Sequence, residues 1–162
     1  MDIYEFAINF EQENQAFYDE FAEKCGNSPL ANVFKNLADE ERKHERIIRQ
    51  MRDNKELEAV ESDILPKAKE AFDEISKELP ENEILPTEQV DIYKKAIEIE
   101  EKSIEFYTEQ AEKADDPEIK AAFERLAEEE KKHERIMDNI TEMVNRPNTW
   151  LEDAEWYHLE DY

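Results

Sequence analysis

Apolar residues recur along this chain at intervals of three and four, which is the period of a helix and not the alternation of a strand. The pattern marks four long segments, and it predicts helices over about residues 2–25, 29–53, 87–114 and 117–145. In the first segment the expected apolar stripe consists of Ile3, Phe6, Phe10, Phe17 and Phe21. The fold class is therefore predicted to be all-α.

Residues at the segment boundaries agree with these helices. Gly26 can take the left-handed position after the first helix. Ser28 followed by Pro29, and Asp116 followed by Pro117, are each typical of an N-cap and a first helical residue. Gly26 is also the only glycine of the chain, and an all-β protein with many tight turns needs more.

More than thirty residues separate the second and third segments, and they contain a short helical pattern over residues 66–79. This length predicts a crossover, over about residues 54–86, that joins two helical hairpins of a four-helix bundle, or a hinge through which two subunits exchange halves. The expected domain spans residues 1–146. Residues 147–162 form an acidic, aromatic tail, in which Trp150 and Trp156 can cover an apolar patch on the bundle or on a second subunit.

The chain contains an internal repeat. Shifted by 89 residues, positions 7–50 align with positions 96–139 without a gap, and 19 of these 44 positions are identical. The second helices of the two halves match best, as FKNLADEERKHERI beside FERLAEEEKKHERI. Identity at this level indicates that the bundle is a duplicated hairpin.

The repeat places matched polar residues on the apolar face of every helix. Glu41 and His44 lie between Leu37 and Ile48 in the second helix, and the other helices carry equivalent residues. The full set consists of Glu11, Glu41, His44, Glu100, Glu130 and His133. Unpaired carboxylates in a core cost several kcal/mol each, and the lysines and arginines nearby fall on neighbouring faces. We therefore expect two divalent metal ions to neutralise the carboxylates.

The spacing of these residues supports a metal site, because Glu-x-x-His places an oxygen and a nitrogen on one side of a helix. One Glu from each of two helices plus Glu-x-x-His from each of the other two is the dinuclear carboxylate arrangement. The alternative is a set of surface glutamates and core histidines. Tyr18 and Tyr107 are expected to hydrogen-bond ligand carboxylates or to be ordinary core residues. The neighbouring glutamates are interpreted as solvated or outer groups: Glu40, Glu45, Glu129 and Glu134.

Charge narrows the possible partners. The 162 residues carry a formal net charge of -24, which repels nucleic acid and anionic membranes and attracts cations. A single cysteine, Cys25, excludes an internal disulfide, and it is expected to be buried near a helix end. The chain shows no secretory signal pattern and no apolar run of transmembrane length, so a cytoplasmic location is expected.

In the inward glutamates, histidines and tyrosines of the repeat, the sequence resembles the ferritin-like superfamily and, within it, the rubrerythrin-like proteins. The resemblance rests on the paired Glu-x-x-His and on a Tyr seven residues after each first-helix Glu. It covers about residues 1–145 and implies a ferritin-like four-helix bundle with a non-haem di-iron centre. Glu41 and Glu130 would bridge the metals, Glu11 and Glu100 would be terminal ligands, and the two histidines would complete the set.

The sequence departs from rubrerythrins in two respects. Rubrerythrins proper add a rubredoxin-type iron site with four cysteines, and this chain has one cysteine. The family also has a further Glu three residues after the third-helix ligand, where this chain has Ser103, with Asn14 at the equivalent place in the first helix. Because the chain lacks the four cysteines of the rubredoxin-type site, any electron donor is expected to be external.

The leading functional hypothesis is a di-iron oxidoreductase that reacts with hydrogen peroxide or dioxygen, as a rubrerythrin-like peroxidase or ferroxidase. One alternative is iron sequestration with a ferroxidase entry step, which requires a shell of subunits. Another is a metal-free helical interaction module. Manganese suits the same ligands as iron. The long crossover and the aromatic tail favour a homodimer over a cage.

Overall fold

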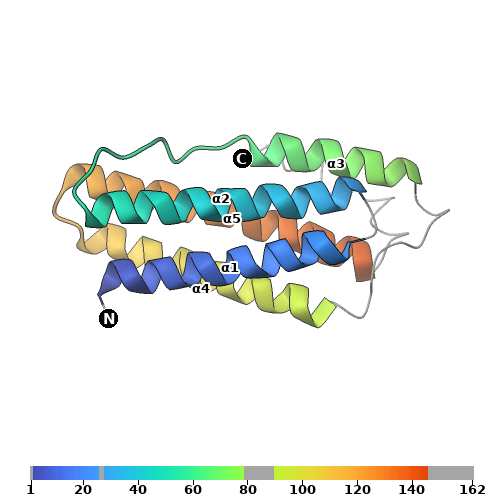
Figure 1. Ribbon diagram of the computed structural model, residues 1–162, viewed down its shortest axis with the longest axis horizontal. Coiled ribbons are helices and arrows are strands. Elements are labelled where there is room, and N and C mark those ends of the chain that lie inside the picture. The colour runs from blue at the N-terminus through green and yellow to red at the C-terminus, as the bar shows by residue number, and fades with distance from the viewer. Residues whose placement is uncertain (1, 26–27, 79–89, 146–162) are drawn as a thin grey trace.

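The computed structural model describes residues 2–25, 28–78 and 90–145. Within them the chain forms five α-helices: α1 (Ile3–Lys24), α2 (Ser28–Arg52), α3 (Ile64–Glu78), α4 (Val90–Lys113) and α5 (Pro117–Asn145). Helices α1, α2, α4 and α5 lie side by side along the long axis of the molecule (Figure 1). The all-α prediction is confirmed, and the arrangement is a ferritin-like helical bundle.

Polar side chains and one left-handed residue set the helix ends. Asp2 caps α1 by accepting a hydrogen bond from the backbone N–H of Glu5 at 2.8 Å. Asp116 accepts one from the N–H of Glu118 at 2.8 Å ahead of α5, as predicted. Asn54 adopts a φ of 55° just after α2, where an asparagine can end a helix in place of glycine. Ser28 is the first residue of α2 and not the residue before it, and Gly26 lies outside the described residues.

The crossover packs on the bundle of its own chain. After α2 the chain runs back along the bundle before it enters α3, which lies beside α2 (Figure 1). Helix α3 contacts α2 and α5 and buries Phe72 and Ile75 completely. The helix predicted over residues 66–79 is therefore present as Ile64–Glu78.

Two apolar clusters fill the bundle, one towards each end. One contains Phe34 and Leu37 of α2 with Ile140 of α5. The other contains Ile47 of α2 and Leu126 of α5. In each bundle helix the inward polar residues fall between the segments that supply these two clusters. The packing therefore leaves a polar layer enclosed between two apolar ones.

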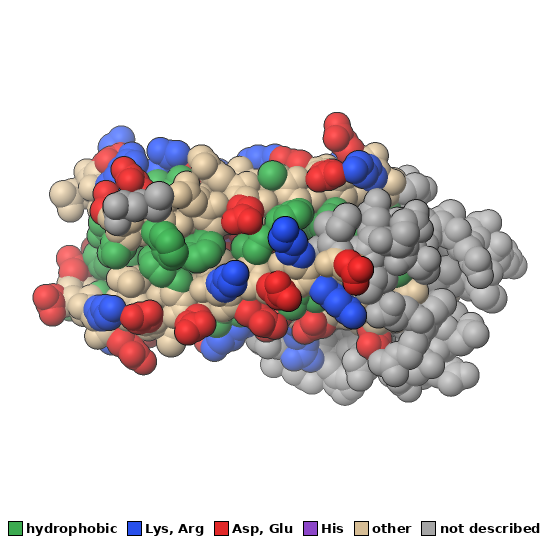
Figure 2. Space-filling model, turned by 90° about the horizontal axis from the view of Figure 1, so that it is seen from below, with side chains coloured by type: hydrophobic (Ala, Val, Ile, Leu, Met, Phe, Trp, Pro, Cys, Tyr) green, Lys and Arg blue, Asp and Glu red, His purple; other side chains and the backbone are tan. Residues whose placement is uncertain are grey.

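The outer side of α1 differs from the prediction. Ile3 and Phe6 are 40% and 46% exposed, so these two residues of the expected stripe do not lie on the buried face, whereas Phe21 of the same stripe is buried. The buried residues of this helix are Ala7, Ile8, Glu11, Asn14, Tyr18 and Phe21. The ring of Phe6 lies 4.9 Å from that of Phe10 and 5.4 Å from that of Phe106 on α4, measured between centroids. Apolar side chains are visible between charged ones when the molecule is seen from below (Figure 2).

None of the helices in the described ranges has both the length and the apolar character that crossing a membrane requires.

Candidate metal centre

The polar layer between the two clusters holds all six residues that the repeat singles out. Helix α1 supplies one glutamate, α4 another, and α2 and α5 each supply a glutamate and a histidine. Every one of these residues is 0% exposed: Glu11, Glu41, His44, Glu100, Glu130 and His133. The structure thus brings together residues that are up to 122 positions apart in the numbering, from Glu11 to His133.

Each histidine contacts a glutamate of the opposite hairpin. Nδ1 of His44 lies 2.5 Å from Oε1 of Glu130, and Nδ1 of His133 lies 2.5 Å from Oε1 of Glu41. The other two glutamates are further away, with Glu11 at 3.7 Å from Nδ1 of His44 and Glu100 at 3.8 Å from Nδ1 of His133. The two contacts are related by the same 89-residue shift as the repeat, so the site has the symmetry of the duplication.

Two groups of ligand atoms overlap within the layer. One consists of Glu11, Glu41, His44 and Glu130, and the other of Glu41, Glu100, Glu130 and His133. Within each group one nitrogen or oxygen atom per residue lies within 4.8 Å of the others. Glu41 and Glu130 belong to both groups, so the same two carboxylates can serve two neighbouring ions.

The tyrosines tie the two hairpins together at this layer. The hydroxyl of Tyr18 on α1 donates to Oε1 of Glu100 on α4 at 2.7 Å. The hydroxyl of Tyr107 on α4 donates to Oε1 of Glu11 on α1 at 2.5 Å. Each bond leaves the second oxygen of its carboxylate without a hydrogen-bond partner. A phenol that holds one oxygen fixes the direction in which the other can bind a ligand.

Burial and mutual repulsion shift the protonation of the carboxylates. Burial, together with the charges of Glu100 and Glu11, raises the pKa of Glu41 well above its ordinary value. Burial raises the pKa of Glu130 in the same way, with the charges of Glu100 and Glu41 added. Burial opposes ionisation of Glu100 too, but hydrogen bonding to Glu130 and the proximity of His133 outweigh it and lower its pKa. A fully ionised cluster therefore requires a compensating positive charge.

The donor set fits a pair of transition-metal ions. Among the described residues, the ion pairs of these four carboxylates are made with the two histidines and not with lysine or arginine. The second oxygen of each carboxylate is buried and has no hydrogen-bond partner. Carboxylate oxygen and imidazole nitrogen are ligands that iron and manganese both accept. These buried groups fit a di-iron site, and their roles as ligands stay a prediction.

Two neighbouring glutamates are less alike than the sequence suggests. Glu129 is only 2% exposed, so of the two interpretations, solvated or outer, the solvated one is wrong. It accepts a hydrogen bond from Ser62 Oγ of the crossover at 2.5 Å and pairs with Lys132. Its repeat equivalent Glu40 is partly exposed, with one buried oxygen. Sequence reasoning missed Ser62 because the repeat does not extend into the crossover.

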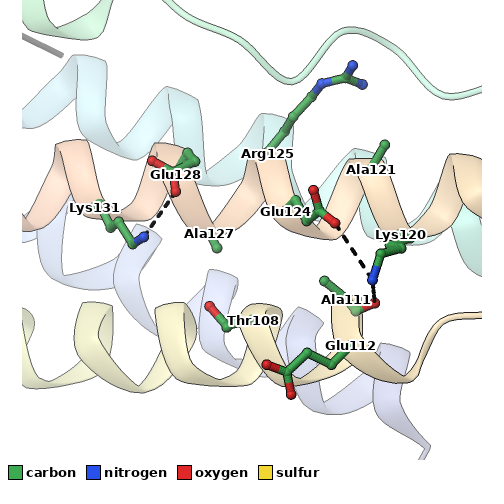
Figure 3. Close-up of a pocket in the computed structure, with 10 residues that line it drawn as sticks. All are labelled: Thr108, Ala111, Glu112, Lys120, Ala121, Glu124, Arg125, Ala127, Glu128 and Lys131. Atoms are coloured by element: carbon green, nitrogen blue, oxygen red, sulfur yellow. Dashed lines mark hydrogen bonds and ion pairs between the residues drawn. The ribbon is translucent and has the colours of Figure 1, made fainter.

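Cys25, which is predicted to be buried near a helix end, is only partly buried and packs against the core at the end of α1. The surface between α4 and α5 also carries a hollow of about 450 Å³ (Figure 3). Lys120 in this hollow donates to the carbonyl oxygen of Ala111 at 3.1 Å and pairs with Glu124. None of the six buried residues lines it, so the polar layer is a separate feature.

An all-helical bundle that encloses a buried layer of carboxylates and histidines fits the class of ferritin-like proteins. The rubrerythrin family model matches residues 2–141 and also residues 91–157. The chain therefore belongs to the rubrerythrin family. No curated protein and no solved structure matches it.

Proposed function

We propose that this protein is a non-haem di-iron oxidoreductase that reduces hydrogen peroxide or dioxygen, with electrons from an external donor. The observation that carries the proposal is the convergence of four carboxylates and two imidazoles, all fully buried, in one layer. Membership of the rubrerythrin family supports it, because that family suggests oxidoreductase-type di-iron proteins.

The proposed ligand set is Glu11, Glu41, His44, Glu100, Glu130 and His133. When bound, an iron pair supplies electrons and Lewis acidity to the oxidant. With peroxide, two electrons and two protons yield two molecules of water. The chain's own residues hold the site in place.

The apolar clusters above and below the layer keep bulk water out. Tyr18 and Tyr107 orient the terminal carboxylates by hydrogen bonds to one oxygen of each. An enclosed, preorganised site strengthens electrostatic interactions at the reacting centre. The structure thus supplies orientation and exclusion of water, which are the protein's part in such chemistry.

The proposal is tested by iron loading followed by oxidant. Chelator-treated protein loaded anaerobically with ferrous iron is expected to bind about two irons per chain. Addition of peroxide should then be followed by its consumption and by ferric absorbance in the near ultraviolet. Glu130→Gln should lose both, and Glu23→Gln, at an exposed position of α1, should keep both. Fewer than one iron per chain, or no consumption of either oxidant, would refute the proposal.

A second function is iron sequestration with ferroxidation as the entry step, which uses the same buried layer. Storage requires a closed shell, so light scattering that shows a cage of many subunits would favour it. We propose a homodimer instead, and the exposed side chains of Ile3 and Phe6 on the outer side of α1 support a contact between copies. A metal-free helical module predicts that Glu41→Ala leaves stability unchanged with and without metal.

A further inference from the structure

Three unpartnered buried polar atoms belong to Glu40, which lies outside the set of six, and to the two histidines of that set. They are Oε1 of Glu40, Nε2 of His44 and Nε2 of His133, and none of them has a hydrogen-bond partner. These three residues also form a group in which one carboxylate oxygen and one ring nitrogen of each histidine lie within 4.8 Å of one another. The two imidazole rings are stacked, with centroids 5.4 Å apart and planes 2° from parallel. One carboxylate is therefore placed to serve two histidines.

The two edges of each ring have different surroundings. Nδ1 of both rings already contacts the inner carboxylates, at 2.5 Å in each case. A neutral imidazole that binds a metal through Nδ1 carries its proton on Nε2, which is then a hydrogen-bond donor. Such a donor needs an acceptor when it is buried, and metal-bound histidines generally find one in a carboxylate, a carbonyl oxygen or a water. Among the described residues, Glu40 is the carboxylate outside the set of six that groups with both rings, within 4.8 Å.

The crossover makes Glu40 different from its repeat equivalent. Glu129 is held by Ser62 Oγ at 2.5 Å and by Lys132 Nζ at 2.5 Å. Lys43, the equivalent of Lys132, donates to the carbonyl oxygen of Glu61 in the crossover at 2.9 Å. Its ammonium group consequently stays 3.8 Å from Oε1 of Glu40. Contacts from the crossover thus occupy one of the two equivalent glutamates and leave the inner oxygen of the other facing the histidines.

We propose that Glu40 is the shared hydrogen-bond acceptor for the Nε2–H groups of His44 and His133, directly or through one bound water, and so fixes both rings with Nδ1 towards the inner carboxylates. Glu40 is a positioning residue, because it acts through the histidines. The inference rests on one part of the proposed function, which is that the six-residue layer binds metal, and it does not depend on reduction of an oxidant. Loss of such an outer partner typically lowers metal affinity by about 10-fold to 100-fold.

Zinc is a suitable probe, because it takes carboxylate and imidazole ligands and has no redox chemistry of its own. Its affinity for the purified full-length chain can be measured by competition with a chromophoric chelator. Glu40→Leu should lower the affinity by about 10-fold to 100-fold, and Glu40→Gln, whose amide oxygen still accepts a hydrogen bond, should restore it to within about threefold. The matched control Glu129→Leu should also stay within about threefold. Circular dichroism checks that each variant folds.

Nitrogen-15 NMR of the zinc-loaded wild type gives a readout that does not depend on any variant. Both site histidines should be protonated at Nε2, with protons that exchange slowly with water. Unprotonated Nε2 atoms, an unchanged zinc affinity in Glu40→Leu, a Glu40→Gln variant as weak as Glu40→Leu, or an equal loss in Glu129→Leu would each overturn the proposal. A third zinc ion per chain that disappears in Glu40→Leu would also overturn it, because Glu40 and the two histidines would then be an outer cation site.

The outcome is separable from that of the proposed function. A wild type that shows the Glu40 effect on zinc but consumes neither oxidant when loaded with iron would refute the oxidoreductase and keep the inference. Oxidant consumption with no Glu40 effect would refute the inference alone. A wild type that binds no zinc would overturn the inference directly.

Discussion

Neutralising two of the buried carboxylates should change stability in opposite directions with and without metal. The perturbation is Glu41→Gln combined with Glu130→Gln, which keeps side-chain shape and removes up to two negative charges. Within each ligand group the atoms lie within 4.8 Å of one another. At an effective dielectric constant of about 20, two unit charges at that separation repel by roughly 3.5 kcal/mol.

The metal-free protein should therefore gain about 1 to 4 kcal/mol of unfolding free energy from this double substitution. The gain should grow as the pH rises, because the raised pKa of Glu41 and Glu130 lets the native cluster keep protons at lower pH and lose them as the pH increases. In the wild type, free metal at 100 times the dissociation constant adds about 2.7 kcal/mol for one site, or roughly 5.4 kcal/mol for two independent sites. The double variant should lose that increment.

Urea unfolding followed by circular dichroism measures both effects, once after chelator treatment and once with excess metal. The exposed substitution Glu23→Gln should change either value by less than about 0.5 kcal/mol. If the metal-free double variant were less stable than the wild type by more than about 1 kcal/mol, the electrostatic reasoning would be wrong. A double variant that still gained the full increment from metal would refute the assignment of these two ligands.

Three further results are expected. The unfolding free energy of the metal-free protein should fall as the pH rises from about 4.5 through the raised pKa of Glu41, because the folded state holds this proton more tightly than the unfolded chain. Metal affinity should rise over the same pH range. Urea melts and chelator competitions over a series of pH values check both expectations. Tyr18→Phe should lower the unfolding free energy in urea melts by about 1.5 to 3 kcal/mol, because it removes a buried hydrogen bond of 2.7 Å to the carboxylate of Glu100. An unchanged unfolding free energy would mean that Glu100 is not charged there. Phe6→Ser should lower the unfolding free energy by less than about 1 kcal/mol, because Phe6 is 46% exposed. Phe34→Ala should lower it by about 3 to 5 kcal/mol, because Phe34 is 0% exposed. Equal shifts of the two variants in thermal melts would show that Phe6 is covered in solution.

Much of the fold follows from features that are local in the sequence. Helical periodicity and the caps at Asp2 and Asp116 depend on neighbouring residues, so the bundle helices and α3 appear close to their predicted ranges. The duplication added information that a single hairpin lacks, because it marked which glutamates recur with the histidines. The convergence of the inward polar residues could therefore be anticipated.

Other features depend on which elements meet in space. Spacing along α1 gives two possible apolar faces, and only the packing of α2 and α4 decides that Tyr18 is buried while Phe6 is exposed. Spacing also places each tyrosine near carboxylates without showing that its bond crosses to the other hairpin. Ser62 reaches Glu129 across 67 residues, and no local pattern in the sequence indicates such a contact.

The cross-hairpin bonds of Tyr18 and Tyr107 also bear on the origin of the protein. Each hairpin carries one phenol, two glutamates and one histidine for the layer, and the two tyrosine hydrogen bonds and the two 2.5 Å histidine contacts join one hairpin to the other. A single hairpin is therefore half of a binding site, whereas two copies of the same hairpin would complete one. An ancestor with only one hairpin could have bound metal as a symmetric dimer, and fusion of two genes would then have allowed the halves to diverge, as Glu40 and Glu129 have done.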